Sequence, residues 1–594
     1  MITSLLVANR GEIAVRILRA CRTMGIRAIA VHSEADADAL HVALADQAIC
    51  IGPAAVGESY LNIGRIIEAA QASGAGAIHP GYGMLSESPE FAAAVVAAGL
   101  VFVGPSAEAI ARMGDKTAAR ALAQAAGLPV LPGSDGVVAE GDDATAIAEA
   151  VGYPVLVKAS FGGGGRGMRI VREAAALPAA LAAARAEAKA AFGRPEVFIE
   201  RFVDRPRHVE VQLIADAHGA VVSLGDRDCT VQRRHQKLLE EAPAPDLPDD
   251  LRTRLAQASR ELARSIGYCG AATVEFLYDR ASGAAYFLEV NTRLQVEHGV
   301  SELISGRDLV VEQIRVASGL PLGFAQDDVV LHGHAIQARI AAEDPAENFR
   351  PAPGPVGAMR LPGGPGIRLD FGVQGGGTVP GHYDSMFGKI HAWGETRQAA
   401  ADRLAAALAE FATSGIPTTA PYLRSVLGRA DYRAMAHDTG SVERDWPAEA
   451  LPAPPTPEEI PMAAKETWIA FDTSEGRLDI AVPLPPTARA PRAEARQGGG
   501  RGGPASDGRS GSPARTMAPM DCTVTEIAVA LGDLVDAGQP LVILEAMKMQ
   551  MPMKAGMAGI VAELSVRAGQ AVRGGELLVR IEPQAALARE GGPA

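Results

Sequence analysis

The chain has 594 residues with a formal net charge of −14, and 48% of the residues are hydrophobic. This length exceeds one ordinary domain, so we expect three or four domains, each with enough apolar residues for its own core. Lysine and arginine are interspersed among the acidic residues and form no basic stripe, which excludes nucleic acid and anionic membranes as general partners.

Cysteine usage and the N-terminal pattern indicate the compartment. The five cysteines are scattered and include no CxxC pair, which argues against a disulfide framework and a zinc site. Arg10 and Arg16 interrupt the apolar runs near the N-terminus, so the pattern fits neither a signal peptide nor a membrane-spanning helix. We therefore expect a cytoplasmic protein.

Residues 1–113 predict an α/β domain. A strand-like run at 2–8 (ITSLLVA) precedes a helix-like run at 12–25 and another strand-like run at 27–32. This regular switch between periods is typical of an α/β layer. The pattern continues through His-Pro-Gly-Tyr-Gly at 79–83.

A glycine loop follows in the second predicted domain, residues 114–330. The sequence KASFGGGGRGM at 158–168 lies between strand-like runs at 153–160 and 168–172. Glycines allow close backbone approach and expose N–H groups to phosphate oxygens. Lys116 and Lys158 would add positive charge for a nucleotide, although the loop matches neither a Walker A nor a Rossmann motif. We predict a nucleotide-binding lid from about residue 131 to 203.

Carboxylates on two strand-like runs predict a metal site in the same domain. Glu289 and Asn291 are two residues apart, so both should lie on one face of a strand, with Glu275 on the neighbouring strand. Such an oxygen-rich set suits Mg²⁺ or Mn²⁺ next to phosphates. The alternative is a group of solvated carboxylates. The polar run that follows favours a site: Arg293, Gln295, Glu297 and His298.

The chain then changes in composition. Mixed sequence from 331 to 446 predicts a third domain, and residues 447–516 predict a linker with a possible strand pair at 467–482. Residues 484–516 consist largely of Pro, Gly, Ala and Arg, which is typical of a flexible coil. Such a coil would span roughly 30–35 Å and let the following domain reach distant sites.

Residues 517–583 contain an internal repeat. Val524–Glu545 recurs as Val561–Glu582, and each copy holds short apolar runs separated by glycines. Two such copies should pack as a small, flattened, all-β barrel. Lys548 lies between them in Ala-Met-Lys-Met and should be displayed in a turn, although exposed lysines are usually only solvated surface.

This segment resembles the biotinyl domain of biotin-dependent carboxylases, which carries biotin on the lysine of that motif. Lipoyl domains share the fold but usually flank the lysine with Asp and Ala, so the methionines favour biotin. The resemblance implies covalent biotin on Lys548, attached by a biotin protein ligase. The chain departs from the family pattern at Asp521-Cys522 and Gln550-Met551.

Residues 1–446 resemble a biotin carboxylase of the ATP-grasp superfamily. The matching motifs are HPGYG at 79–83, GGGGRGM at 162–168, RHVEVQ at 207–212, RDCTVQRRHQKLLEEAPAP at 227–245 and EVNTRLQVEH at 289–298. Two positions depart from the family: Gly299 begins a Gly-Val-Ser-Glu run where Pro-Val-Thr-Glu is usual, and Phe161 replaces a frequent glycine.

The resemblance assigns roles residue by residue. It implies ATP binding by Lys116, Lys158, Gly164, Gly165, Met168, His208 and His235, with Glu200 to Val203 lining the adenine pocket. It implies metal binding by Glu275, Glu289 and Asn291, and bicarbonate binding by Lys237, Arg293, Gln295 and Val296. Glu297 would deprotonate bicarbonate, which attacks the γ-phosphate of ATP to give carboxyphosphate. Carboxyphosphate would then break down to CO2 and phosphate. The phosphate would take the biotin N1 proton, while Arg339 stabilises the resulting enolate.

The combined modules predict the α chain of an acyl-CoA carboxylase, for acetyl-CoA or propionyl-CoA. A carboxyltransferase needs several hundred further residues, so a separate β subunit is implied. The alternatives are a methylcrotonyl-CoA, geranyl-CoA, urea or pyruvate carboxylase, and a non-catalytic carrier. The last alternative predicts loss of catalytic residues, yet all are present: Lys116, Glu275, Glu289, Glu297 and Arg339.

A dimeric carboxylase core is a further hypothesis. Arg16 and Arg19 lie on the helix that the family uses for the dimer contact, but two arginines on a helix are usually just solvated.

Overall fold

The computed structural model describes residues 1–134, 136–139, 143–159, 168–192, 195–448, 466–473, 476–483, 514–519, 522–546 and 549–583. Gly164, Gly165 and Lys548 of the predicted site, and most of the predicted linker, lie outside these ranges. Lys116 begins a helix, but its side chain is also outside the described part.

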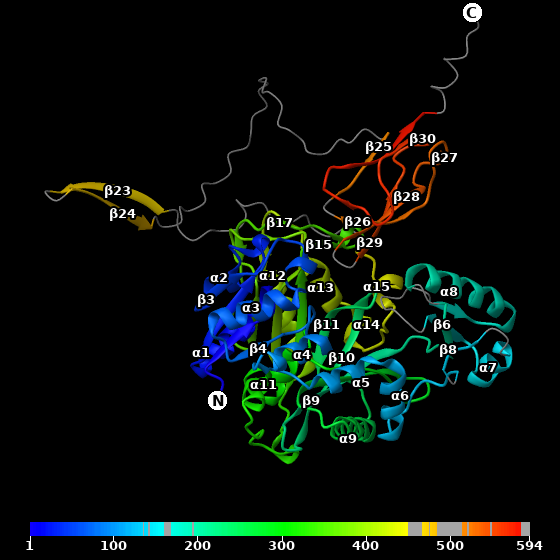
Figure 1. Cartoon of the computed structure of the whole chain (residues 1–594), viewed down its shortest axis with the longest axis horizontal. Coiled ribbons are helices and arrows are strands. Elements are labelled where there is room, and N and C mark those ends of the chain that lie inside the picture. The colour runs from blue at the N-terminus through cyan, green and yellow to red at the C-terminus, as the bar shows by residue number, and fades with distance from the viewer. Residues whose placement is uncertain are drawn as a thin grey trace, which may run out of the picture.

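The N-terminal segment forms the predicted α/β layer (Figure 1, blue). Its sheet is parallel, in the order β3-β2-β1-β4-β5. The strands are β1 Ser4–Val7, β2 Arg27–His32, β3 Gln47–Cys50, β4 Ala77–His79 and β5 Val101–Phe102. The helices are α1 Gly11–Met24, α2 Leu40–Leu44, α3 Ile63–Ser73 and α4 Pro89–Ala97. Helix α1 ends at Gly25 because glycine accepts the left-handed φ of 68°.

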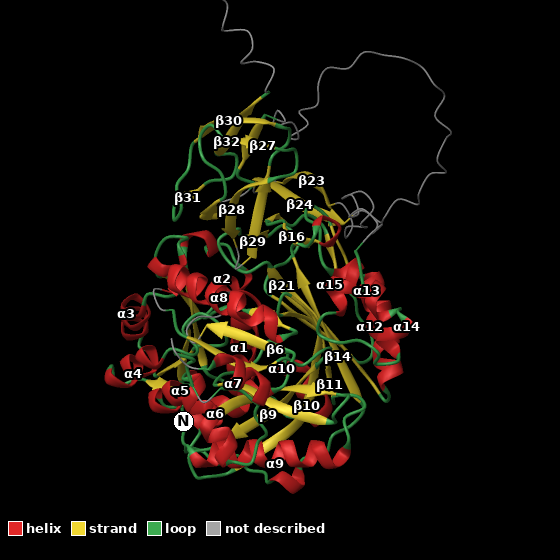
Figure 2. Ribbon diagram, turned by 90° about the vertical axis from the view of Figure 1, so that its right-hand side faces the viewer, coloured by secondary structure: helices red, strands yellow, loops and turns green. Residues whose placement is uncertain are grey.

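An eight-stranded antiparallel sheet forms the centre of the molecule, in the order β13-β12-β9-β10-β11-β14-β21-β19 (Figure 2). Its strands are β9 Arg207–Ala215, β10 Val221–Arg233, β11 Gln236–Ala242, β12 Gly270–Asp279, β13 Ala284–Asn291, β14 His334–Ala341, β19 Ile367–Phe371 and β21 Met386–Gly394. Strands β11 and β14 pair directly, so one continuous sheet crosses the predicted boundary at residue 330.

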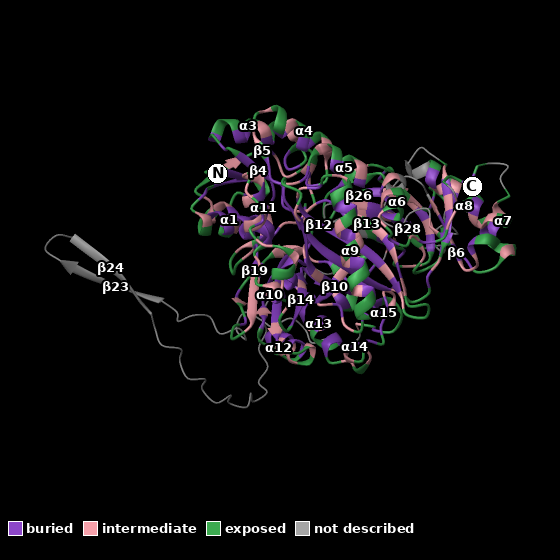
Figure 3. Ribbon diagram, turned by 90° about the horizontal axis from the view of Figure 1, so that it is seen from below, coloured by how far each residue is buried: buried purple, intermediate pink, exposed green. Residues whose placement is uncertain are grey.

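Helices and apolar clusters cover this sheet, and Figure 3 shows buried residues concentrated on its strands. The helices are α5 Ala107–Gly114, α6 Lys116–Ala125, α9 Asp249–Ser265, α10 His298–Ser305, α11 Leu309–Ala317, α12 Arg397–Glu410, α13 Ala420–Leu427, α14 Ala430–Arg433 and α15 Ser441–Arg444. One cluster joins Leu5 and Ile13 of the N-terminal layer to Ile214 of β9. The N-terminal layer is therefore packed against the central sheet.

Short strand pairs complete the part of the chain that contains α12 to α15. They are β15 Glu343–Asp344 with β16 Arg350–Pro351, β17 Gly354–Pro355 with β20 Thr378–Val379, and β18 Met359–Arg360 with β22 Ala412–Thr413.

The predicted lid has a small sheet and a core of its own. Strands β6 Val155–Ala159, β7 Arg169–Val171 and β8 Val197–Arg201 pair in the order β7-β6-β8, and helices α7 Ala144–Val151 and α8 Leu177–Phe192 belong to the same segment. The strand pair that flanks the glycine loop is thus confirmed. Val155, Val197 and Leu181 belong to an apolar cluster separate from the main core, which suits a segment that moves as a unit.

The C-terminal segment is the predicted all-β unit, with two four-stranded sheets in the orders β25-β32-β30-β27 and β29-β28-β26-β31. Its strands are β25 Arg515–Met517, β26 Cys522–Ile527, β27 Leu534–Val535, β28 Pro540–Ala546, β29 Met549–Lys554, β30 Gly559–Leu564, β31 Ala571–Val572 and β32 Leu577–Glu582. The strand pair predicted in the linker is confirmed as β23 Glu466–Thr473 with β24 Gly476–Pro483.

The internal repeat is also a repeat of turns. Asp533 accepts a hydrogen bond from Ala530 N at 2.8 Å, and at the matching turn Gln570 accepts one from Arg567 N at 3.0 Å. The glycine of each turn has a positive φ, 93° at Gly532 and 83° at the equivalent Gly569. The two copies therefore use the same turn geometry, as their sequences predict.

In the described part of the chain, none of the helices combines the length and the apolar character that crossing a bilayer requires.

One glycine of the all-β unit gives a stability prediction. A Cβ at Gly559 would lie 2.2 Å from the carbonyl oxygen of Glu582, and backbone there cannot move without disturbing β32. We expect Gly559→Ala to cost about 1–3 kcal/mol or more of this unit's stability. Calorimetry of the full chain should show a lower transition for this unit alone. Gly64→Ala is the control, since its nearest atom is 3.5 Å away; equal shifts in both variants would contradict the prediction.

Candidate active site

A cavity of about 1290 Å³ opens between the N-terminal layer, the lid and the central sheet. Most of the predicted site residues line it: Lys158, Met168, Glu200, Val203, His208, His235, Lys237, Glu275, Glu289, Asn291, Arg293, Gln295, Val296 and Arg339. Glu297 is fully buried beside it and contacts two of these residues, Lys237 and Arg339. Residues spread over 180 positions of sequence thus meet at one site.

Lys237 forms hydrogen bonds to three buried carboxylates of the site. Its ammonium donates to Glu210 at 2.7 Å, Glu275 at 2.9 Å and Glu297 at 2.6 Å. Burial alone lowers the pKa of Lys237, but Cys229 and the three carboxylates outweigh burial and raise this pKa well above its usual value. Lys237 is therefore a permanent cation at physiological pH.

Glu297 is held ionised by several cations. It is the residue before α10, and its second carboxylate oxygen accepts a hydrogen bond from Arg339 Nη2 at 3.0 Å. Burial raises the pKa of Glu297, yet Lys237, Arg339 and Arg227 overcome burial and hold that pKa well below its usual range. The carboxylate is thus available as a proton acceptor.

Arg339 lies on β14 and reaches the cavity from the third predicted domain. Its Nε donates to Glu240 of the adjacent strand β11, so two carboxylates fix the guanidinium plane. Such a planar, charged group with fixed geometry suits the recognition of an oxyanion or a polarised carbonyl.

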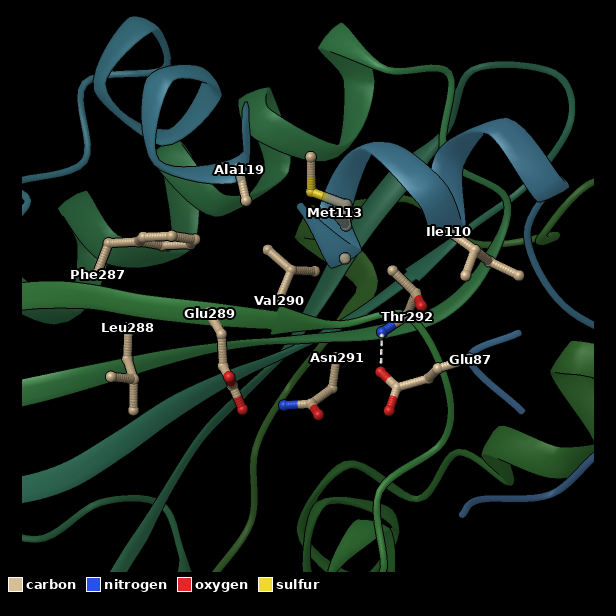
Figure 4. Close-up of a pocket in the computed structure, with 11 residues that line it drawn as sticks. Glu87, Ile110, Met113, Ala119, Phe287, Leu288, Glu289, Val290, Asn291 and Thr292 are labelled. Atoms are coloured by element: carbon tan, nitrogen blue, oxygen red, sulfur yellow. Dashed lines mark hydrogen bonds between the residues drawn. The ribbon is translucent and has the colours of Figure 1, made fainter. Parts of the chain in front are cut away.

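Arg293 is oriented by hydrogen bonds to three side chains. Its nitrogens donate to Glu87 at 2.8 Å, to Asn291 Oδ1 at 2.8 Å and to Gln295 at 2.9 Å. Glu87 also accepts a hydrogen bond from the Thr292 backbone N–H at 3.2 Å (Figure 4). Glu87 therefore anchors the segment after β13 to the N-terminal layer.

The predicted metal ligands lie together at one end of the sheet. Glu275 of β12 pairs directly with Glu289 of β13, and both line the cavity with Asn291. Figure 4 shows Glu289 and Asn291 on one side of β13 and Val290 on the other, as the spacing of two predicts. Two carboxylates and an amide oxygen match the donors that Mg²⁺ prefers, so these residues fit a magnesium ion next to nucleotide phosphates.

Glu275 also has cationic neighbours in the structure. His208 Nε2 lies 3.1 Å from one of its oxygens, and Gln295 donates to the other at 3.0 Å. Burial raises the pKa of Glu275, but Lys237 and His208 outweigh that effect and lower the pKa well below its usual value. An ionised Glu275 is what a metal site requires.

The lid and a hairpin turn supply further polar groups. Lys158 of β6 donates to Glu200 of β8 at 2.7 Å. His235 lies with Arg234 in the two-residue turn between β10 and β11, and both have a positive φ, 65° and 48°. This is the backbone of a type I′ hairpin turn, and it brings His235 to the cavity.

Sequence reasoning assigned no role to several residues that hold the site together. Arg227 is fully buried and donates to Glu210, Gln212, Thr273 and Ser301. Other residues without a predicted role also make contacts at the site. Glu240 binds Arg339, Glu87 binds Arg293, and Lys389 forms an ion pair with Glu12. A signal was available for Glu210 and Gln212, because they alternate with apolar residues in RHVEVQ and so share a strand face with His208.

The suggestion that Arg16 is solvated is wrong. Arg16 is buried and forms ion pairs with Glu302 at 2.9 Å and Asp308 at 2.6 Å, because α1 packs against α11 and the neighbouring α10. Arg19 on the same helix is exposed, as expected for a solvated arginine.

The structure explains the departure at Gly299. A Cβ at this position would lie 2.3 Å from Nε2 of His391, a buried residue of β21. The imidazole therefore occupies the space that a larger residue at position 299 would need. Gly299 of α10 and His391 of β21 therefore form a matched pair.

Four family models match the chain along most of its length. They are the biotin carboxylase N-terminal domain at 1–110, the carbamoyl-phosphate synthase L chain ATP-binding domain at 115–325, the biotin carboxylase C-terminal domain at 337–444 and the biotin-requiring enzyme model at 512–581.

Individual relatives agree with these models. A biotin carboxylase from Nostoc is 53% identical over 71% of this chain and 94% of its own length. The biotin-dependent acyl-coenzyme A carboxylase alpha3 subunit from Mycobacterium leprae is 42% identical over 98% of this chain and 99% of its own. A Campylobacter jejuni biotin carboxylase structure, 46% identical, has a TM-score of 0.71 over 75% of this chain and 99% of its own.

The chain therefore belongs to the biotin-dependent carboxylases. It contains an ATP-dependent biotin carboxylase together with a biotinyl domain. A biotin carboxylase domain of 2-oxoglutarate carboxylase from Hydrogenobacter thermophilus, solved with MgADP and bicarbonate, is 42% identical with a TM-score of 0.70, covering 75% of this chain and 97% of its own.

The matched pair predicts an energetic coupling. Gly299→Ala should destabilise the protein by about 1–3 kcal/mol, because the new methyl group overlaps the His391 ring. In His391→Ala the ring is gone, so adding Gly299→Ala should cost much less. Thermal denaturation of the two single variants, the double variant and the parent measures this coupling. Strictly additive effects would contradict it.

His79 of the HPGYG motif predicts a pH dependence of stability. Its Nδ1 accepts a hydrogen bond from Gly81 N at 3.0 Å, and burial, aided by Arg16, lowers the pKa of His79 to about 3. The unfolded state has a pKa near 6.5 and binds the proton first, so stability falls as pH drops below about 6.5, by up to about 1.4 kcal/mol per pH unit.

Urea unfolding of the full chain at pH 7, 6 and 5 measures this slope. His79→Gln should reduce the pH slope of the unfolding free energy by the contribution of about one proton, at most ~1.4 kcal/mol per pH unit. His235→Gln provides a control for the substitution itself, because it replaces an exposed imidazole rather than a buried one. A parental slope in His79→Gln would refute the assignment.

Proposed function

We propose that this chain is the α subunit of an acyl-CoA carboxylase that serves acetyl-CoA or propionyl-CoA, with its carboxyltransferase on a separate β chain. The observation that carries this proposal is the likeness to the M. leprae alpha3 subunit over 98% of the chain, carboxylase and biotinyl segments included. Pyruvate carboxylase is the second candidate, because a pyruvate carboxylase subunit from Methanothermobacter thermautotrophicus is 49% identical over 73% of this chain.

In the proposed first step, Lys237, Arg293, Gln295 and the Val296 backbone bind bicarbonate next to Glu297. Lys237 and Arg293 supply the positive charge, and Glu297 accepts the bicarbonate proton. A bound anion opposes the effect of Lys237 on Glu297, so the pKa of Glu297 rises and the carboxylate becomes a stronger base. The deprotonated bicarbonate then attacks the γ-phosphate of ATP, giving carboxyphosphate and ADP.

The same proposal assigns the nucleotide to the lid side of the cavity. Lys116, Lys158, Gly164, Gly165, Met168, His208 and His235 would contact ATP, and Glu200 to Val203 would line the adenine pocket. Glu275, Glu289 and Asn291 would hold Mg²⁺ or Mn²⁺, which supplies charge neutralisation for the phosphates. Closure of the lid would exclude water from carboxyphosphate.

Biotin, attached to Lys548 by a biotin protein ligase, would supply the ureido nitrogen that accepts the carboxyl group. Arg339 would contact the ureido oxygen, and its two carboxylate partners hold the guanidinium in place for that role. The described residues on either side of Lys548, Ala546 and Met549, pair with each other, which supports attachment at this point of the chain.

The chain would be cytoplasmic, with a dimeric carboxylase core. Its units would divide at residues 113, 330, 446 and 516, and the family-model limits at 110, 325, 444 and 512 support boundaries near these positions.

ATP- and bicarbonate-dependent carboxylation of free biotin by the purified chain tests the site. Glu297→Gln should lower kcat by about 10²–10⁴, because it removes the general base with little change of shape. Lys548→Ala should keep this activity and lose only the mass increase from biotinylation. Unchanged turnover in Glu297→Gln would exclude the assigned base.

The acceptor is tested by adding a purified carboxyltransferase β chain of the acyl-CoA class with labelled bicarbonate. We expect label in acetyl-CoA or propionyl-CoA, and none with Lys548→Ala. Transfer to pyruvate in the absence of any acyl-CoA product would support the second candidate instead.

A further inference from the structure

Lys389 is a fully buried lysine outside the residues assigned to substrate binding. It lies in the middle of β21, and its side chain has no exposed surface. Burying an ammonium is expensive unless each of its donors finds a partner. The partners of Lys389 therefore indicate what the residue does.

One partner is a backbone carbonyl in the proposed bicarbonate loop. Lys389 Nζ donates to the Val296 carbonyl oxygen at 2.9 Å. Val296 lies between Gln295, whose side chain contacts Glu275, and Glu297. A hydrogen bond to this carbonyl fixes the peptide plane from which the Glu297 side chain extends.

The other partners belong to the N-terminal layer. Glu12 of α1 lies 3.1 Å from the ammonium, and the ring centroid of Tyr82 is 5.8 Å away. Glu12, Tyr82 and Val296 all line the cavity. Lys389 thus ties the loop to a wall of the cavity formed by a different part of the chain.

The register of the sheet adds a second connection. Lys389 is directly opposite Arg339 on β14, and Arg339 binds the Glu297 side chain. Two cross-strand basic residues therefore hold adjacent positions of the loop, one through a backbone carbonyl and the other through a carboxylate. His298 supports the loop as well, through its Nδ1 contact of 2.7 Å with the Gln295 carbonyl.

We propose that Lys389 is a positioning residue for bicarbonate: by binding the Val296 carbonyl, it sets the place of Gln295 and Glu297 relative to Lys237 and Arg293. This inference rests on the proposed role of that loop in bicarbonate binding. The residues proposed to contact ATP lie at the start of α6, on the lid, on β9 and in the β10–β11 turn, not in the loop that Lys389 binds. We therefore expect the effect of Lys389 to fall on bicarbonate.

A purely structural role is the competing explanation, because Lys389 also neutralises Glu12. Burial raises the pKa of Glu12 to about 7 even though Lys389 lowers it. Removing Lys389 alone would leave this carboxyl buried and unpaired, with a loss of stability that has no bearing on bicarbonate. A test must therefore remove both groups.

Four forms of the full chain separate the two roles: the parent, Glu12→Gln, Lys389→Met and the double variant Glu12→Gln/Lys389→Met. Methionine is close to lysine in shape and cannot donate to Val296. Thermal denaturation reports stability, and free-biotin carboxylation gives kcat and the KM values for bicarbonate and ATP.

We expect Lys389→Met to lose stability and the double variant to regain most of it. Both should show a bicarbonate KM raised about tenfold, the effect of losing one charged hydrogen bond, with the ATP KM within about twofold of the parent. Glu12→Gln alone gives the reference bicarbonate KM for the double variant, because it keeps Lys389.

The proposal is overturned if the double variant recovers the bicarbonate KM of Glu12→Gln, since Lys389 would then act only through charge balance. Equal increases in both KM values would overturn it too. Glu297→Gln in the same assay distinguishes this failure from failure of the proposed site, because an active Glu297→Gln refutes the assigned loop itself.

Discussion

The buried ion cluster around Lys237 is the constraint on which the site depends. One ammonium contacts Glu210, Glu275 and Glu297, and removal of one member of such a cluster leaves uncompensated charge in the interior at a cost of about 3–5 kcal/mol. The cluster couples the predicted metal site to the predicted base, because Lys237 binds both Glu275 and Glu297. The positions of these charged groups are thus fixed by their mutual contacts before any ligand binds.

The continuous sheet explains how this cluster is built. Glu275, Glu210, Lys237 and Arg339 come from β12, β9, β11 and β14, which are all members of one antiparallel sheet. Neighbouring strands lie about 4.8 Å apart, so side chains on one face are held at distances that ion pairs require. The loop after β13 then adds Arg293, Gln295 and Glu297 along the same face. Segments that look like separate domains in the sequence therefore share one site.

The C-terminal all-β unit does not share the central sheet and has its own apolar core. Its two sheets and repeated turns form a self-contained core that includes Val524, Leu544 and Leu578. Paired strands β28 and β29 bring together Ala546 and Met549, the first and last residues of the Ala-Met-Lys-Met motif. The repeat therefore gives this unit a core of its own, within the residues 512–581 that match the biotin-requiring enzyme model.

Local patterns in the sequence determined much of the fold and part of the site. The alternation at 2–32, the strand pair beside the glycine loop and the two-residue spacing of Glu289 and Asn291 depend only on near neighbours, and the structure has each of them. The repeated glycines predicted the turns of the all-β unit for the same reason, since a positive φ is a local requirement.

Tertiary structure decided what depends on partners far away in the chain. From the sequence alone Arg16 would be a surface charge. In the structure it is buried and forms ion pairs with Glu302 and Asp308, almost 300 positions later in the chain. Arg227 and Glu240 lie in the 227–245 motif, but neither this motif nor the sequence around Lys389 shows what these residues do. Their roles come from cross-strand pairing and from contacts with other elements. The glycine at position 299 is explained only by the structure, where the His391 ring occupies the space of a larger residue. Sequence by itself determined the residue types that the chemistry needs, whereas packing decided which charges are buried together, since burial depends on the whole fold.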